Sequence, residues 1–251
     1  MRHLYKIFLM ILVIIFYIPY YSSGHLFSNA YSQNSNLVFL PGDKPYNQTF
    51  NKWVEEWFNW FLSIGDINGG HPRNSYSPEK CSWNQTSGPV WNLADGADRA
   101  NVDQPEIREC KVPAGKALLV QIVGSNCSTV EGYKNEQELR NCAVWILDRA
   151  IISASIDGTE IMNTIKNPTD KDKFYIKPFD TNVTYAPHNI YGYKPGTYPG
   201  MEAGYFLFVK PLKPGNHQIE FKEIDENCPE GILAPTCDKR DTHVLYLLNV
   251  V

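Results

Sequence analysis

The residues with the clearest chemical potential are six cysteines, at Cys81, Cys110, Cys127, Cys142, Cys228 and Cys237. An even number of cysteines in an exported chain favours disulfide bonds, and six cysteines allow 15 pairings. We expect nearest neighbours to pair, as 81–110, 127–142 and 228–237, because each bond then closes one local loop. The alternative is a metal site, but no two cysteines have the C-x2-C spacing of zinc ligands.

Four histidines outside the first 30 residues are candidate metal ligands: His71, His188, His217 and His243. None has the H-x-H or H-E-x-x-H spacing, and the chain does not end in the Cys-His-Met cluster of a blue-copper loop. The sequence therefore predicts no metal and no other cofactor. His217 shares strand parity with Ile219 and Phe221, so we expect its side chain to point inwards and to be hydrogen-bonded.

Catalysis by a nucleophile or by paired carboxylates has little support in the sequence. There is no G-x-S-x-G elbow, and the cysteines are better explained as disulfides. A glycosidase needs two carboxylates about 5–10 Å apart across the scissile bond. Glu55 and Glu56 are expected on a solvated helix face, whereas Asp157 and Glu160 belong to a hairpin turn, so no carboxylate is placed opposite another.

The stretch from Val183 to Gly204 is unusually rich in tyrosine and proline. Tyrosine rings offer a flat apolar face and a hydroxyl, which suit sugar rings or a protein partner. Because function often resides on such loops, we predict the ligand-binding residues Tyr191, Tyr193, Tyr198 and His188. The alternative is an ordinary long loop whose side chains pack onto the domain.

The N-terminal segment has the pattern of a targeting sequence. Arg2 and Lys6 precede the apolar run from Ile7 to Ile18, which is typical of a secretory signal peptide. The run is shorter than the roughly 20 residues of a membrane-spanning helix, although the neighbouring tyrosines leave an uncleaved anchor as the alternative. We therefore expect residues 1–30 to be a signal peptide or N-terminal membrane anchor, and residues 31–251 to be a single domain at the cell surface or outside the cell.

The composition excludes some classes of partner. Removing Arg2 and Lys6 from 23 basic residues leaves 21 against 27 acidic ones, a net charge of −6. Without a basic stripe, nucleic acid is not an expected partner, and contact with a membrane is expected only through the N-terminal segment.

Sequons for N-glycosylation occur at four positions: Asn47, Asn84, Asn126 and Asn182. Asn126 directly precedes Cys127, where a disulfide would crowd a glycan. We therefore predict glycosylation at Asn47, Asn84 and Asn182.

Two helices are expected. Aromatic residues recur at helical spacing from Phe50 to Ile64, with Thr49 as N-cap and Gly65 as the C-terminal stop. The three tryptophans of this helix could form a sugar platform or a membrane-facing stripe, but we favour packing against a sheet. The second helix is expected from Asn135 to Ile151, where Asn135 and Glu138 form a capping signature. Its apolar face comprises Leu139, Ala143, Ile146, Leu147 and Ala150.

The remaining pattern is that of strands. We expect short strands at 37–40 and 89–93, a buried strand at 117–123, a strand at 173–177 and a closing strand at 243–250. Asp157-Gly158 predicts a type I′ hairpin. The stretch from Ala203 to Ile224 is interpreted as a further hairpin turning at Pro214-Gly215. About eight strands and two helices favour a mainly β, two-layer antiparallel sandwich, jelly-roll-like, with the helices packed on it.

Two segments carry a resemblance to a known group. The first is C-x3-Q-x2-G-x-V-W, from Cys81 to Trp91, followed by R-x-C-x-V-P-A-G-K from Arg108 to Lys116; the second is PLKPGNHQIEF, from Pro211 to Phe221. Together they resemble uncharacterised secreted β-sandwich proteins of microbes, over about two thirds of the chain. The resemblance implies export and a β fold, and it implies no activity or functional residue.

These observations favour a secreted or cell-surface non-catalytic protein that binds a glycan or an envelope protein. One alternative is a structural accessory subunit of a surface complex. The other is an extracellular hydrolase acting on polysaccharide.

Overall fold

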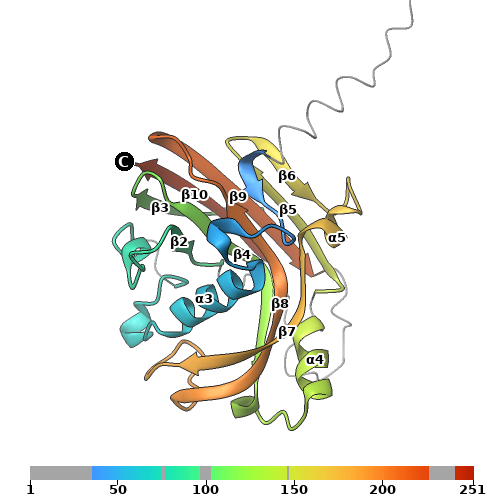
Figure 1. Ribbon diagram of the computed structural model, residues 1–251. Coiled ribbons are helices and arrows are strands. Elements are labelled where there is room, and N and C mark those ends of the chain that lie inside the picture. Colours follow the sequence, from blue (N-terminus) through green and yellow to red (C-terminus); the bar gives the residue numbers. More distant parts are fainter. Residues whose placement is uncertain (1–35, 75–76, 97–102, 146, 226–240) are drawn as a thin grey trace, which may run out of the picture. The chain divides into compact units, whose positions relative to one another are not determined.

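The computed structural model describes residues 36–251 except 75–76, 97–102, 146 and 226–240. Within these residues, ten strands form two five-stranded sheets (Figure 1). The predicted leader, residues 1–30, and the predicted pair Cys228–Cys237 lie outside the described residues. In the part of the chain that is described, no helix is both long and apolar enough to cross a membrane.

The first sheet has the order β1 (Val38–Phe39), β8 (Gly196–Val209), β4 (Ala117–Ser128) and β2 (Val90–Leu93), and β7 (Tyr175–Tyr185) also pairs with β8. The second sheet has the order β3 (Glu106–Val112), β10 (Thr242–Val250), β9 (Gly215–Asp225), β5 (Ala150–Ile156) and β6 (Thr159–Asn163). The expected strands near 37–40, 89–93, 117–123 and 243–250 are therefore confirmed.

The sheets are mixed, so the prediction of an antiparallel sandwich is wrong in this respect. β2 pairs with β4, and β3 pairs with β10, in parallel register. The chain leaves the first sheet after β2, contributes β3 to the second sheet and then returns as β4 in the direction of β2. Parallel pairing requires such a crossover, and here the crossover is a strand of the other sheet. The jelly-roll-like connectivity stays a prediction.

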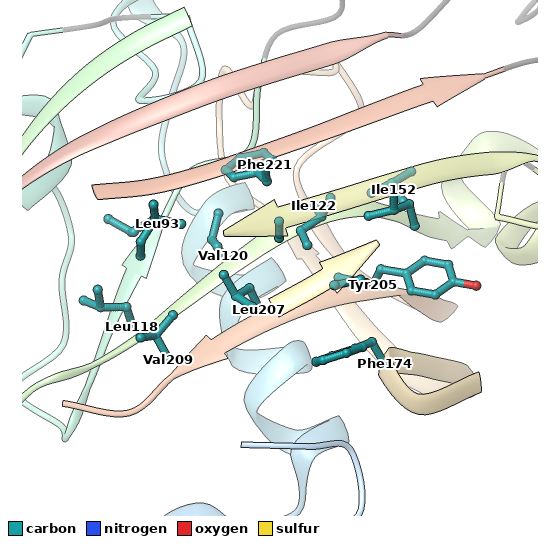
Figure 2. Packing of buried hydrophobic residues seen from close by; sticks show 14 of the residues in the cluster. Leu93, Leu118, Val120, Ile122, Ile152, Phe174, Tyr205, Leu207, Val209 and Phe221 are labelled. Atoms are coloured by element: carbon teal, nitrogen blue, oxygen red, sulfur yellow. The ribbon is translucent and has the colours of Figure 1, made fainter. Parts of the chain in front are cut away.

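The two sheets enclose the main hydrophobic core. Figure 2 shows Val120 and Leu207 of the first sheet facing Phe221 of the second, with Ile122 and Ile152 beside them. Along β4 the side chains alternate, so that Leu118 and Val120 enter this core while Leu119 points to the opposite face of the first sheet. Because both faces of β4 are covered, its first half from Ala117 to Val123 is apolar on both faces, with Gln121 as the exception.

Helix α3 (Phe50–Leu62) covers that opposite face, as predicted. The hydroxyl of Thr49 accepts a hydrogen bond from the amide of Lys52 and caps the helix. Trp53, Trp57 and Trp60 are all buried, and Trp57 Nε1 donates to the carbonyl of Leu93 at 2.9 Å. The interpretation that the tryptophans pack against the sheet is therefore confirmed.

The second helix is shorter than predicted. α4 (Glu136–Val144) begins after its N-cap Asn135 as expected, but Ala150 already belongs to β5. Ile146 lies outside the described residues. Isoleucine and alanine at 150–152 fit a buried strand as well as a helix face, so the apolar pattern alone set the boundary too late.

A third helix, α5 (Asp170–Phe174), was not predicted. The strand expected at 173–177 begins at Tyr175, because Lys173 and Phe174 complete this short helix. Four 3₁₀ turns complete the described elements: η1 (Pro45–Asn47), η2 (Ile67–Gly69), η3 (Lys80–Ser82) and η4 (Thr129–Glu131).

The prediction of a hairpin from Ala203 to Ile224 is also wrong. β8 belongs to the first sheet and β9 to the second, so the segment between them crosses from one layer to the other. Pro211 and Pro214 donate no amide hydrogen bond, and residues 210–214 form no helix or strand as they cross between the layers. The Asp157-Gly158 hairpin is confirmed, with φ values of 49° and 74° that suit a type I′ turn.

Two disulfide bonds are described, and both follow the expected nearest-neighbour pairing. Cys81–Cys110 ties η3 to β3, and Cys127–Cys142 ties the end of β4 to α4. The first bond closes the loop between residues 81 and 110, which contains little regular structure. The second bond attaches α4, which has few buried residues.

Candidate functional site

The predicted tyrosine-rich loop is largely built into a β-hairpin. β7 runs to Tyr185 and β8 starts at Gly196, and these two residues are paired, so that only residues 186–195 connect the strands. Asn189 organises this connection: its side chain donates to the carbonyls of Ala186 and Tyr193 and accepts from the amide of Tyr193. The expectation of one long loop from Val183 to Gly204 was wrong because the tyrosines and threonines at its ends suit paired strands.

The loop is fastened to the end of α3. The amide of Asp66 donates to the carbonyl of His188 at 2.7 Å, and Gly65 forms a β-bridge with Asn189. His188 has a positive φ of 58° and an exposed side chain on this side of the loop. The structure therefore places His188 at the junction with α3, whereas the tyrosine rings contact one another.

Three predicted tyrosines gather around Tyr185, which is buried at the end of β7. The ring centroid of Tyr185 lies 5.4 Å from that of Tyr193 and 6.2 Å from that of Tyr198, and Tyr191 follows at 6.0 Å from Tyr193. Tyr193 and Tyr198 are half-buried against the α3 side of the sheet. Tyr191 is 45 % exposed, so its ring is the main aromatic surface that this cluster presents to solvent.

A chain of polar side chains lies beneath the tyrosine cluster. The hydroxyl of Tyr185 lies 3.0 Å from the hydroxyl of Ser128 and donates to Asn126 Oδ1 at 3.2 Å. Glu131, on η4, accepts from the amide and the hydroxyl of Ser128. It also accepts from the hydroxyl of Tyr193 at 3.4 Å, which joins the cluster to the polar chain.

Burial shifts the acidities in this polar chain. It raises the pKa of the Glu131 carboxyl, against the opposite effect of the hydrogen bonds from Ser128 and Tyr193. It also raises the pKa of the Tyr185 phenol, so the hydroxyl of Tyr185 stays protonated. The hydrogen bond to Glu131 and the edge-on ring contact with Tyr185 hold Tyr193 in place.

Glu202 ends the polar chain inside the protein. Its carboxyl accepts from the amide of Asn126 at 3.0 Å, and its other oxygen has no hydrogen-bond partner within the described residues. Burial, followed by the nearby charge of Glu55, raises the pKa of Glu202 well above its ordinary value. The sequence carried one signal of this residue, a lone glutamate in the otherwise apolar run of β8.

The other candidate residues are dispersed. His71 is fully buried and its Nε2 lies 2.9 Å from the carbonyl oxygen of Phe61, and burial lowers the pKa of its imidazole. Glu55 pairs with Lys52, and Glu160 pairs with Lys166. Among the described residues, no group of three His, Cys, Asp or Glu side chains could hold a metal ion.

His217 is partly exposed and is not among the residues of the main core. The expected hydrogen bonding is confirmed: its ring lies 2.7 Å from Asp157 Oδ2 and 2.9 Å from the carbonyl oxygen of Lys213. These contacts hold the ring beside the β5–β6 turn and the segment that precedes β9.

Two residues of the segments that resemble secreted β-sandwich proteins, Gln85 and Arg108, hold loop backbone to the strands. Gln85 bonds to the carbonyl of Cys81 and to the backbone of Asn92, which holds the disulfide loop against β2. The buried guanidinium of Arg108 pairs with Glu106 and donates to the carbonyls of Pro72 and Arg73. These contacts fasten the long loop to β3.

The three asparagines predicted to carry glycans, Asn47, Asn84 and Asn182, are exposed. Asn126 is half-buried, and its side-chain amide is engaged with Glu202 and Tyr185. Glycosylation at the three exposed positions stays a prediction.

Comparison with known proteins gives no family for this chain. No protein-family model matches it, and no curated protein matches it. A solved structure of PbICP-C in complex with falcipain-2 is similar with a TM-score of 0.27 and 16% identity, over 64% of this chain and 98% of that one. The solution structure of Amebosin is similar with a TM-score of 0.21 and 13% identity, over 65% of this chain and 100% of that one. Similarity at this level carries no argument about fold or function.

Proposed function

We propose that this chain is an exported, non-catalytic protein that binds a glycan or another component of the cell envelope through the surface around Tyr191. The single observation that carries the proposal is the exposed ring of Tyr191 beside Tyr193, whose centroids are 6.0 Å apart with planes inclined by 36°. Two neighbouring aromatic faces at a loop tip suit the apolar face of a sugar ring.

The contacts beneath this surface support recognition rather than catalysis. The hydroxyl of Tyr193 contacts Glu131, and its ring packs edge-on against Tyr185. A ring that is held in place before binding loses little conformational entropy when a ligand arrives. Tyr198, at the start of β8, and His188, in the connection between β7 and β8, complete the proposed surface.

Export is supported by two lines. The two described disulfide bonds are typical of oxidising compartments, and the first 30 residues have the pattern of a secretory leader. An extracellular or cell-surface location follows from this proposal, together with contact to envelope polysaccharide.

A retention experiment tests the proposal. Purified, oxidised protein is incubated with cell-envelope polysaccharide and the bound fraction is measured. Tyr191→Ala is expected to lower the affinity about tenfold, because it removes one exposed stacking face. Tyr46→Ala is the matched control, since Tyr46 is 42 % exposed on a different part of the chain. Equal retention of the wild type and Tyr191→Ala would overturn the site, and co-purification with one protein partner instead would favour a structural subunit.

A further inference from the structure

The outer face of the second sheet carries a groove that the proposed function does not use. Its volume is about 740 Å³, and its floor is formed by side chains of β3, β10 and the first residues of β9. In Figure 1 these strand segments lie at the upper end of the view, beside the C-terminus, whereas the connection between β7 and β8 lies at the lower end. The groove is open to solvent along one side, and its volume lies within the range of clefts that hold small ligands.

One wall of the groove is held by His217. One ring nitrogen lies 2.7 Å from Asp157 Oδ2 and the other lies 2.9 Å from the carbonyl oxygen of Lys213. Both partners are hydrogen-bond acceptors, so the two contacts together favour the imidazolium form of His217, in which both ring nitrogens donate. Asp157 also accepts from the amide of Gln218, which fixes the β5–β6 turn against the start of β9.

The charged side chains that line the groove balance one another. The His217 cation is compensated by Asp157, and Lys111 lies two residues from Glu109 on the same exposed face of β3. A charged ligand would gain no net attraction from four charges that cancel. The charge balance favours a neutral ligand.

Amide side chains supply the directional contacts. Asn249 Nδ2 donates to Asn216 Oδ1 at 2.9 Å across β9 and β10. Each amide keeps further donor or acceptor capacity, because an amide offers two N–H donors and two acceptor lone pairs. Gln218 stands beside them, paired in register with Leu247, whose half-buried side chain gives the floor an apolar patch.

We propose that this groove is a second binding site and that its ligand is a short neutral oligosaccharide. Each sugar hydroxyl is both a donor and an acceptor and matches the amides of Asn216, Gln218 and Asn249. The C–H face of a sugar ring matches Leu247, and the balanced charge matches a sugar without acidic groups. The site is separate from Tyr191 and stands or falls independently of it.

Nuclear magnetic resonance titration of the full, oxidised protein tests the site. The probes are the pentasaccharides of cellulose, chitin and starch, with an alginate pentasaccharide as the acidic probe. With at least one neutral probe, the side-chain amide signals of Asn216, Gln218 and Asn249 are expected to shift in a saturable manner. Gln218→Ala should weaken this binding at least tenfold, whereas Lys222→Ala, on the same face of β9 outside the groove, should not change it.

The variant Tyr191→Ala separates this site from the proposed function. Groove signals that still shift in Tyr191→Ala would support a second site. Shifts confined to the loop around Tyr191, or no shift in the groove at millimolar sugar, would overturn the groove while leaving the Tyr191 proposal to its own test. Stronger binding of the acidic probe than of every neutral one would also overturn it, because it contradicts the charge balance.

Discussion

At the scale of single residues, the buried carboxyl of Glu202 makes stability depend on pH. Its pKa is raised by burial, so the folded state holds this proton more tightly than the unfolded chain, whose ordinary value is 4.5. The contribution of protonated Glu202 to the free energy of unfolding is complete below pH 4.5. It is lost as the pH rises through the folded-state pKa. We expect Glu202→Gln to raise the free energy of unfolding at pH 8 by about 1 kcal/mol or more, because an amide cannot ionise.

Urea unfolding at pH 5 and pH 8 measures this effect. The difference between the two pH values should shrink in Glu202→Gln and should persist in Glu220→Gln, whose carboxylate is exposed on β9. If Glu202→Gln were less stable than the wild type at pH 8, the claim that the buried Glu202 carboxylate destabilises the fold at this pH would be contradicted.

His217 should titrate above its ordinary value. Burial opposes the charged form, but the hydrogen bonds to Asp157 and to the carbonyl of Lys213, with the charge of Asp157, together raise the pKa of the imidazole above 6.5. Its contribution to stability is therefore complete below pH 6.5 and is lost as the pH rises through the folded-state pKa. The imidazole signals should report a lower pKa in Asp157→Asn and no change in Glu109→Gln. A wild-type pKa at or below 6.5 would contradict the contact geometry.

At the scale of elements, Trp57 is one of the aromatic side chains that attach α3 to the first sheet. The side chain is fully buried, packs edge-on against Phe206 of β8 with centroids 5.6 Å apart and donates to the carbonyl of Leu93. Trp57→Ala should lower the free energy of unfolding by about 3–5 kcal/mol, as large-to-small changes in cores do. Asn51→Ala, on the exposed side of the helix, should change it by less than about 0.5 kcal/mol. Equal effects of the two changes, measured by urea unfolding, would contradict the burial of Trp57 between α3 and the first sheet.

The two described disulfides should differ modestly in their effect. They join residues 29 and 15 positions apart, and loop-closure entropy then gives about 3.6 and about 3 kcal/mol at 25 °C. The paired Cys→Ser variants of Cys81–Cys110 and Cys127–Cys142 should each lower the unfolding temperature by this mechanism. If reduction left the unfolding temperature of the wild type unchanged, neither bond would contribute to stability.

At the scale of the whole molecule, local patterns predicted elements better than connections. The spacing of aromatic residues predicted α3, and Asp157-Gly158 predicted its hairpin, because helical periodicity and type I′ geometry are properties of neighbouring residues. The crossing between β8 and β9 could not be predicted in the same way. Two strands separated by Pro211 and Pro214 have the same local pattern whether they pair with each other or enter different sheets.

The candidate site was predictable in part for the same reason. The tyrosine-rich composition pointed to Tyr191, Tyr193 and Tyr198, and the structure brings their rings around Tyr185. The sequence could not indicate which ring faces solvent, because exposure depends on the packing of η4 and α3 against the loop. It also could not reveal that Glu131 and Glu202 share one polar chain, since 71 positions separate them.

The central claim is that the surface around Tyr191 binds a glycan, and a thermal-unfolding screen of the oxidised protein against envelope glycans tests it most directly. A ligand present at 100 times its Kd stabilises the folded state by about 2.7 kcal/mol, which is a clear shift in unfolding temperature. We predict that at least one glycan raises this temperature and that the glycan is recovered intact. The rise in unfolding temperature should be smaller in Tyr191→Ala than in the wild type. A glycan recovered in hydrolysed form, or a shift that Tyr191→Ala leaves unchanged, would contradict the claim.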